Sequence, residues 1–211
     1  MGMFRPHLRI ILDLLFPPST HERLLRTITK ERFFACYQPT TYTNVISLAP
    51  YQNRIIQAAV AACKFEKNQY GAELLACLLQ HWLDTHRVSG RTICLPIPLS
   101  HAREKERGFN QVTRVLEHIP HTASYTLEKN WIIRPIDTKR QTSLDRKARL
   151  ENMKGAFTVS PEMLHTNWDG VSRVIICDDV ITTGATLEAA RKVLRGRVPN
   201  EIPIICMAWA H

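Results

Sequence analysis

Hydrophobic residues along the chain fall into two kinds of pattern. Short unbroken apolar runs, of which residues 92–95 and 174–177 are the strongest, are typical of strands buried on both faces of a parallel sheet. Longer segments place apolar residues three and four positions apart, which predicts amphipathic helices. The two kinds of segment alternate, so we expect an α/β fold with a twisted, mainly parallel sheet flanked by helices. The predicted strands are 43–48, 92–95, 131–133, 174–177 and 202–209, and the predicted helices begin near residues 51, 71, 109 and 187.

The N-terminal part differs from the rest of the chain. Residues 8–16 are mostly apolar but include Arg9 and Asp13, and two prolines follow them. This run is too short to span a bilayer, so it predicts an amphipathic helix, a cytoplasmic protein and no membrane partner. We expect residues 1–42 to form a small hood and residues 43–211 to form the main domain.

Charge is concentrated in one stretch of the sequence. The chain has 211 residues, 45% of them hydrophobic, and a formal net charge of +9. Residues 103–154 contain 12 Lys and Arg against 7 Asp and Glu, so they carry +5 of that charge. Such a stretch serves an anionic substrate, a nucleic acid or solubility, and charge alone does not choose among them.

Six cysteines are scattered along the chain, and no two of them have the C-x-x-C spacing of a zinc ribbon. Cys63, Cys77, Cys94 and Cys177 lie in apolar runs, which predicts buried, reduced thiols. No cysteine is a good candidate for a nucleophile.

The segment with the clearest chemistry is 174–186. An apolar strand is followed by two adjacent acids, a short hydroxyl-rich turn with one glycine, and a helix. Backbone N–H groups at a helix N-terminus favour an anion, and carboxylates at the end of a buried strand accept hydrogen bonds from vicinal hydroxyls. A plain crossover with a solvated acidic pair is the other interpretation, but a sugar phosphate satisfies both halves of the segment.

This segment resembles the phosphoribosyl pyrophosphate (PRPP) binding loop of type I phosphoribosyltransferases. The resemblance implies that Asp178 and Asp179 bind the ribose hydroxyls and stabilise positive charge on the ring. It also implies a Mg²⁺ ion that is held through the substrate, without direct protein ligands. The residues implied for the 5-phosphate are Thr182, Thr183, Gly184, Ala185 and Thr186.

A basic loop is predicted at 99–111, after two prolines that turn the chain out of the sheet. In type I phosphoribosyltransferases the equivalent loop holds the pyrophosphate, which makes Arg103, Lys105 and Arg107 candidates for that role. The other interpretation is a solvated loop in which Glu104 and Glu106 neutralise these charges.

A second polar and basic stretch, 134–144, is expected to be mobile and to lead into a short basic helix at 145–151. Next to a phosphate site, such a stretch suits a lid that closes over substrate. It suits contact with a nucleic acid equally well. The candidates for either role are Lys139, Arg140 and Arg146.

Several short segments extend the resemblance to the ComF family, the competence-protein-F-like phosphoribosyltransferases, from about residue 43 to the C-terminus. The most specific is Arg107-Gly108-Phe109-Asn110-Gln111. Members of that family often carry a four-cysteine zinc module near the N-terminus, and here only Cys36 remains. Zinc is therefore not expected, and apolar packing is expected to hold the hood. The other shared segments are Lys64-Phe65, Pro96-Ile97-Pro98, Arg134 with Thr138 and Gln141, and Asn152 with Gly155-Ala156-Phe157.

Two functions stay open. The first is a Mg²⁺-dependent PRPP-binding phosphoribosyltransferase linked to DNA uptake or nucleotide handling. Thr182 stands where the 6-oxopurine enzymes carry an aspartate, which argues against a 6-oxopurine acceptor, and nothing else in the chain indicates which base is the acceptor. The second is a non-enzymatic adaptor for single-stranded DNA or DNA-processing proteins, supported by the basic stretch near Phe109 and Trp131. A homodimer is compatible with both.

Overall fold

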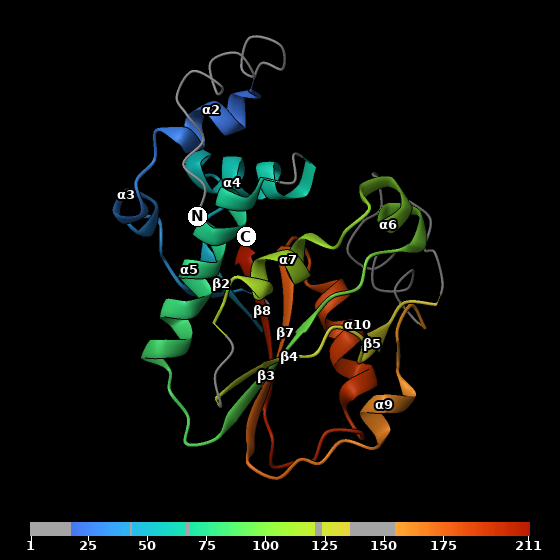
Figure 1. Cartoon of the computed structure of the whole chain (residues 1–211). Coiled ribbons are helices and arrows are strands. Elements are labelled where there is room, and N and C mark those ends of the chain that lie inside the picture. The colour runs from blue at the N-terminus through green and yellow to red at the C-terminus, as the bar shows by residue number, and fades with distance from the viewer. Residues whose placement is uncertain (1–17, 43, 66–67, 121–123, 136–154) are drawn as a thin grey trace.

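The centre of the protein is a six-stranded sheet in the order β1-β2-β8-β7-β3-β4 (Figure 1). The computed structural model describes residues 18–42, 44–65, 68–120, 124–135 and 155–211. Strand β1 runs antiparallel to β2, and the other four neighbouring pairs are parallel, which confirms the predicted mainly parallel α/β architecture. The six strands are β1 (Thr40–Tyr42), β2 (Val45–Ala49), β3 (Arg91–Pro96), β4 (Tyr125–Leu127), β7 (Val171–Val180) and β8 (Ile204–Ala210).

Helices cover both faces of this sheet (Figure 1). The central strand β7 shows why, because its side chains alternate between two apolar clusters. Ile175 and Cys177 pack into a cluster with α4, α5 and α7, whereas Val174 and Ile176 pack into a cluster with α9 and α10. These helices are α4 (Arg54–Phe65), α5 (Gln69–Thr85), α7 (Gln111–Glu117), α9 (Pro161–Leu164) and α10 (Ala185–Leu194), and the small two-stranded sheet β5 (Ile132–Ile133) and β6 (Thr158–Val159) lies beside the second cluster.

The hood contains two short helices, α2 (Thr20–Arg26) and α3 (Lys30–Phe34), which the charged sequence of this stretch did not predict. Leu25, Ile28 and Phe33 are nearly fully buried in the cluster that α4 and α5 form. The Tyr70 hydroxyl of α5 also donates to the Ile28 carbonyl at 2.8 Å. The division at residue 42 stays a prediction, and the expected helix at 8–16 lies outside the described residues.

The predicted loop at 99–111 was wrong in its first half, because His101–Arg107 forms helix α6. Ser100 caps this helix by accepting from the Arg103 N–H, and Gly108 ends it with a positive φ of 71°. None of its seven residues is buried. An exposed helix has no apolar stripe for sequence analysis to detect. Strand β4 was also missed.

The cysteine prediction is largely confirmed. All six cysteines are free thiols, and Cys63, Cys94 and Cys177 are buried, whereas Cys77 is partly exposed. None of the helices in the described ranges is long and apolar enough to cross a membrane.

The carboxyl ends of β7 and β3 lie side by side, and the chain leaves them in opposite directions. From β3 it continues through α6 and α7 to β4 at one edge, and from β7 it continues through α10 to β8. Open parallel sheets bind ligands in the crevice at such a switch point. This crevice therefore is the place where the fold favours a binding site.

Candidate functional site

Asp178 and Asp179 lie at the carboxyl end of β7, next to the switch point. Both residues are partly exposed, although the five residues before them, 173–177, are buried. The Asp179 N–H donates to Asp178 Oδ1 at 2.8 Å, and the Val180 N–H donates to Asp179 Oδ1 at 2.7 Å. These bonds orient the two carboxylates toward the edge of the sheet.

Asp179 is held by side chains from two helices. The Lys64 Nζ of α4 lies 2.7 Å from Asp179 Oδ2, and the Gln111 Nε2 of α7 donates to the same oxygen at 2.8 Å. Gln111 is itself only 5% exposed, and its Oε1 accepts from Arg107 Nη1 at 2.8 Å. Lys64, Asp179, Gln111 and Arg107 thus form one continuous network, which we call the acid-pair network.

Asn110 fixes the helix that carries Gln111. Its Nδ2 donates to the Ile97 carbonyl at 2.8 Å, and its Oδ1 caps α7 by accepting from the Val112 and Thr113 N–H groups. The Ile97 N–H in turn donates to the Cys177 carbonyl at 2.9 Å. The predicted turn of the chain around Ile97 therefore connects α7 to the strand that bears the acids.

The two carboxyls differ in charge. Burial, together with the neighbouring Asp179 carboxylate, raises the pKa of Asp178 to about 7. Burial acts in the same direction on Asp179, but the Lys64 ammonium and the hydrogen bonds from Lys64 and Gln111 outweigh it and lower the pKa of Asp179. Asp179 is therefore ionised at neutral pH, whereas Asp178 changes its protonation state close to neutral pH.

The turn after the acids has the geometry expected of an anion-binding helix start. Gly184 is the N-cap of α10 and has a φ of 75°, a conformation that favours glycine. Gly184 has no side chain, so the N-cap residue itself does not cover the first N–H groups of α10. The Ala185 N–H donates to Thr183 Oγ1 at 3.4 Å, and Thr182 is exposed. The turn and the acid pair are thus adjacent, as the sequence indicated.

Three of the six basic candidates lie on helix α6, and the other three lie outside the described residues. Arg103 is exposed on α6, yet its positive charge acts on Asp178 and offsets a small part of the rise in the pKa of that carboxyl. Arg107 is partly buried in the acid-pair network, and Lys105 is exposed on the same helix. Lys139, Arg140 and Arg146 lie outside the described residues, so their role stays a prediction.

Sequence analysis gave no role to Lys64, Phe65 or Gln111, although they stand in the segments that carried the family resemblance. Lys64 and Gln111 hold Asp179, as described above. Phe65 is 69% exposed beside the site, and the Arg107 guanidinium lies 5.4 Å from its ring centroid. The signal that marked these residues was the resemblance, because no periodicity or spacing singles them out.

Of the two aromatic residues named for nucleic-acid stacking, Trp131 is buried and Phe109 is partly exposed. Trp131 is 8% exposed and packs edge to face with Trp168, and the Arg114 guanidinium covers the Phe109 ring at 4.5 Å. The burial of Trp131 removes that residue from the support for an adaptor, whereas the Phe109 ring stays partly exposed.

The described residues offer a metal ion few ligands. No three His, Cys, Asp or Glu side chains come together within the described part of the chain. Asp179 Oδ2 is occupied by Lys64 and Gln111, whereas Asp178 accepts a bond at Oδ1. Mg²⁺ is commonly bound through one or two carboxylates together with substrate oxygens, and the acid pair suits that arrangement.

Comparisons with known proteins give relatives for this chain. It is 32% identical over 139 residues to "Competence protein F" of Haemophilus influenzae, which is 66% of this chain and 59% of that protein. It is 30% identical over 178 residues to "DNA utilization protein YhgH" of Salmonella typhi, which is 81% of this chain and 75% of that protein. "Competence protein ComFC" of Bacillus subtilis is 29% identical over 102 residues, which is 48% of this chain and 38% of that protein.

A solved hypoxanthine phosphoribosyltransferase of Staphylococcus aureus matches 66% of this chain and 63% of its own, with a TM-score of 0.37 and 15% identity. No protein-family model matches the chain. The match to the Salmonella protein extends over three quarters of that protein at 30% identity. On the strength of that match, the chain belongs to the ComF family.

Proposed function

We propose that this protein binds PRPP at the carboxyl ends of β7 and β3 and acts as a phosphoribosyltransferase in the handling of DNA or nucleotides. The observation that carries the proposal is the acid-pair network, which joins Asp179 to Lys64, Gln111 and Arg107 beside the turn at Gly184. Two carboxylates, an anion-binding helix start and a cluster of cations lie together, and a sugar that carries phosphates needs all three.

Each part of the site has a task in this proposal. The N–H groups and hydroxyls of residues 182–186 bind the 5-phosphate. Asp178 and Asp179 accept hydrogen bonds from the ribose hydroxyls and stabilise positive charge that develops on the ring as the bond from C1 to pyrophosphate breaks. Arg103 and Arg107 lie where they can attract the departing pyrophosphate.

Asp178 is the carboxyl with room for a new partner. Asp179 Oδ2 already accepts from Lys64 and Gln111, so this carboxylate is preorganised and keeps its charge. Asp178 lacks a cation at ion-pair distance among the described residues. Where Mg²⁺ binds together with the substrate, Asp178 would be the side chain that faces it, and the ion would supply positive charge to offset that of the phosphates.

The names of the relatives suggest the setting of this activity. Two of them are competence proteins and one is a DNA utilization protein. We therefore infer a role in the use of imported DNA, in which phosphoribosyl transfer handles bases or nucleotides. The matched region spans 59% of the Haemophilus protein. The inference therefore concerns only the part of that protein to which this chain is similar.

The test is a thermal-shift titration with PRPP and Mg²⁺ on the wild type and on the double variant Asp178→Asn, Asp179→Asn. At about a hundred times the dissociation constant, PRPP should stabilise the wild type by about 2.7 kcal/mol. The double variant should show no shift. Two further titrations test the parts of the site separately. A shift with ribose 5-phosphate alone reports binding at the turn, and a shift with pyrophosphate alone reports binding at the basic side chains.

The matched control is Asp169→Asn, which makes the same chemical change at an exposed residue before β7. It should keep the full PRPP shift. The unliganded midpoint of each variant shows whether it folds. A wild-type protein that is not stabilised by PRPP, or a double variant that is stabilised equally, would refute the proposal.

A second candidate function is binding of single-stranded nucleic acid beside the same site. Its support is Phe65, which is 69% exposed and has the Arg107 guanidinium over its ring at 5.4 Å. An exposed aromatic ring next to a cation is a stacking platform for a base. This ring is more exposed than those of Trp131 and Phe109, which the sequence suggested.

A further inference from the structure

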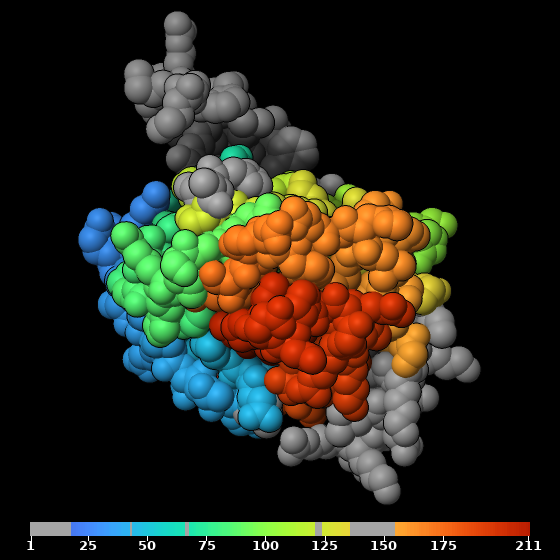
Figure 2. Space-filling model, turned by 90° about the horizontal axis from the view of Figure 1, so that it is seen from below, coloured from blue at the N-terminus to red at the C-terminus, as the bar shows by residue number. Residues whose placement is uncertain are grey.

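A cavity lies at the end of the sheet opposite the acid pair, where β3, β4 and β7 begin. Its volume is about 420 Å³, which is the size of a small-molecule site. Arg173 of β7 lines it and precedes Asp178 by five residues, so the two are roughly 16 Å apart along the strand. Figure 2 looks onto this end of the molecule, where the green segment that leads into β3 and the orange segment that leads into β7 lie side by side.

Arg173 is a buried cation that is held in one orientation. It is 5% exposed, its Nε donates to Thr92 Oγ1 at 2.9 Å, and its Nη1 donates to the His86 carbonyl at 2.6 Å. Its guanidinium lies 5.1 Å from the Trp82 ring centroid, and the His86 ring stacks on that same tryptophan at 4.4 Å. The side chain is therefore preorganised rather than free to turn toward solvent.

This cation has no counter-ion in the described part of the chain. No carboxylate lies within ion-pair distance of Arg173, and its Nη2 has no hydrogen-bond acceptor among the described residues. Nη2 is also not closed off from solvent, because it is absent from the fully buried atoms that lack a partner. Burial lowers the pKa of the Arg173 guanidinium; the Cys94 thiol opposes this shift, and no carboxylate does. A buried charge without a counter-ion is costly, and a bound anion would offset that cost.

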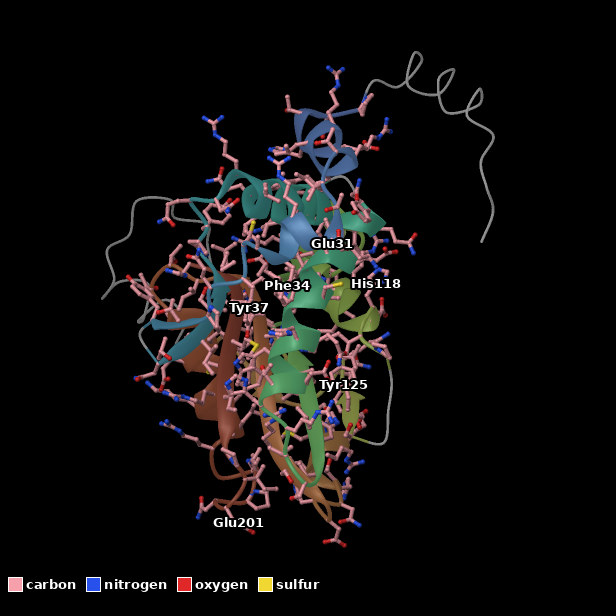
Figure 3. The ribbon with its side chains drawn as sticks, turned by 90° about the vertical axis from the view of Figure 1, so that its left-hand side faces the viewer. Glu31, Phe34, Tyr37, His118, Tyr125 and Glu201 are labelled. Carbon is pink, nitrogen blue, oxygen red and sulfur yellow. The ribbon has the colours of Figure 1, made fainter. Side chains whose placement is uncertain are left out.

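The remaining walls of the cavity suit an organic ligand. Leu83, Val88 and Pro120 give it an apolar side, and Ser124 adds a hydroxyl. Figure 3 labels Tyr125, which also lines the cavity, beside the lower end of α5. The buried Tyr125 hydroxyl donates to the Leu116 carbonyl at 3.2 Å, so the ring is a fixed part of the wall.

One acid lines the cavity, and it is already engaged. Asp84 accepts from Gln80 Nε2 at 3.1 Å and lies 3.9 Å from Arg87 Nη2. Its side chain is 51% exposed and that of Arg87 is 81% exposed, so this pair lies at the mouth of the cavity. The three charged side chains that line the cavity leave a net charge of +1.

We propose that this cavity is a second ligand site, for a small organic anion whose phosphate or carboxylate group faces Arg173 and whose apolar part lies against Leu83, Val88 and Pro120. The site is separate from the acid pair and does not depend on the function proposed for it. A role for Arg173 only in capping the C-terminus of α5 accounts for Nη1 but leaves Nη2 and the cavity without a purpose.

The test follows the Nε–Hε signal of Arg173 by NMR while inorganic phosphate, phenyl phosphate or benzoate is added at constant ionic strength. Arg173→Lys assigns the signal by removing it. We expect a saturable shift with all three probes and tighter binding of phenyl phosphate than of inorganic phosphate, by at least about threefold, because of the apolar wall. If phenyl phosphate binds more tightly than benzoate, the preferred head group is a phosphate, and if benzoate binds more tightly, it is a carboxylate.

Two serine variants make a matched pair that keeps the buried arginine. Ser124→Glu places a negative charge in the cavity wall and should abolish saturation, whereas Ser89→Glu places it on a nearby exposed residue outside the lining and should not. Asp178→Asn, Asp179→Asn should leave the shift unchanged. The proposal is overturned if the shift does not saturate, if Ser124→Glu binds as the wild type does, or if the acid-pair variant loses the shift.

Discussion

Lys64 reaches across the edge of the sheet to Asp179, with its Nζ 2.7 Å from Oδ2. The two side chains are 22% and 14% exposed, so the pair is shielded from solvent but not sealed from it. The lysine is the second-last residue of helix α4, and the aspartate is the second-last residue of strand β7. This contact explains why a lysine stands at the end of an otherwise apolar helix, since it keeps one acid of the pair ionised.

Replacement of this lysine should destabilise the protein more than replacement of a surface lysine. Lys64→Met leaves the Asp179 carboxylate with less compensation in a half-buried place, which we expect to lower the free energy of unfolding by about 1–3 kcal/mol. Urea unfolding measures this change. Lys129→Met is the control, because Lys129 pairs with Glu117 with both side chains nearly half exposed, and it should cost less than about 1 kcal/mol. Equal losses for the two variants would contradict this account.

The titration of Asp178 predicts how stability changes with pH. Its pKa is about 7 in the folded protein, and its ordinary value is 3.8. Between these values the folded state holds a proton that the unfolded chain has lost. Stability therefore falls as pH rises through this window, and it is lowest above about pH 7.

Urea unfolding at about pH 5.5 and about pH 8 tests this expectation on the wild type and on Asp178→Asn. Between these two pH values, the titration of Asp178 should lower the free energy of unfolding of the wild type by at least about 1 kcal/mol. The variant should lack that part of the loss. Asp179 adds nothing here, because its pKa is lowered and its contribution is lost only as pH falls below its ordinary value. Identical pH dependence in the two proteins would disprove the raised pKa of Asp178.

The glycine that starts α10 should matter for both stability and binding. Gly184 has a φ of 75°, so Gly184→Ala strains the backbone and should cost about 1–2 kcal/mol. Because the strain lies in the turn proposed to bind phosphate, PRPP affinity should fall about tenfold or more in a calorimetric titration. Gly196→Ala is the matched control, since Gly196 has a φ of 81° and open space around its Cα. That variant should lose comparable stability and keep its PRPP affinity.

The part of the site that sequence predicted is the part that is contiguous in the chain. Asp178, Asp179 and the turn to Thr186 follow one another, so a strand, two acids and a helix start can be recognised without knowledge of the fold. The contacts of Lys64 and Gln111 with Asp179 join residues far apart in sequence, and only the packing of α4 and α7 on β7 creates them. Local patterns carry no information about such contacts.

Secondary structure shows the same division. Helices α4, α5 and α10 were predicted because each buries an apolar stripe. Helix α6 was missed because its sequence is almost entirely charged and polar, and its ends are defined by Ser100 and Gly108 rather than by burial. Arg173 was overlooked for a different reason, since it lies directly before the apolar run 174–177 of β7, and only the tertiary structure shows a cavity beside it.

The exposed ring of Phe65 leads to a prediction about nucleic acid. If a base stacks on this ring under Arg107, Phe65→Ala should weaken binding of a short oligo(dT) strand by about 5- to 100-fold in a fluorescence anisotropy titration at fixed salt. Phe65→Trp should retain the affinity, because it keeps an aromatic face. Phe34→Ala is the control, since Phe34 is 36% exposed but stacks with Tyr37, and it should bind as the wild type does. Equal effects of the two alanine variants would show that general surface change, and not stacking at this site, determines the affinity, and the case for nucleic-acid binding beside the acid pair would then fail.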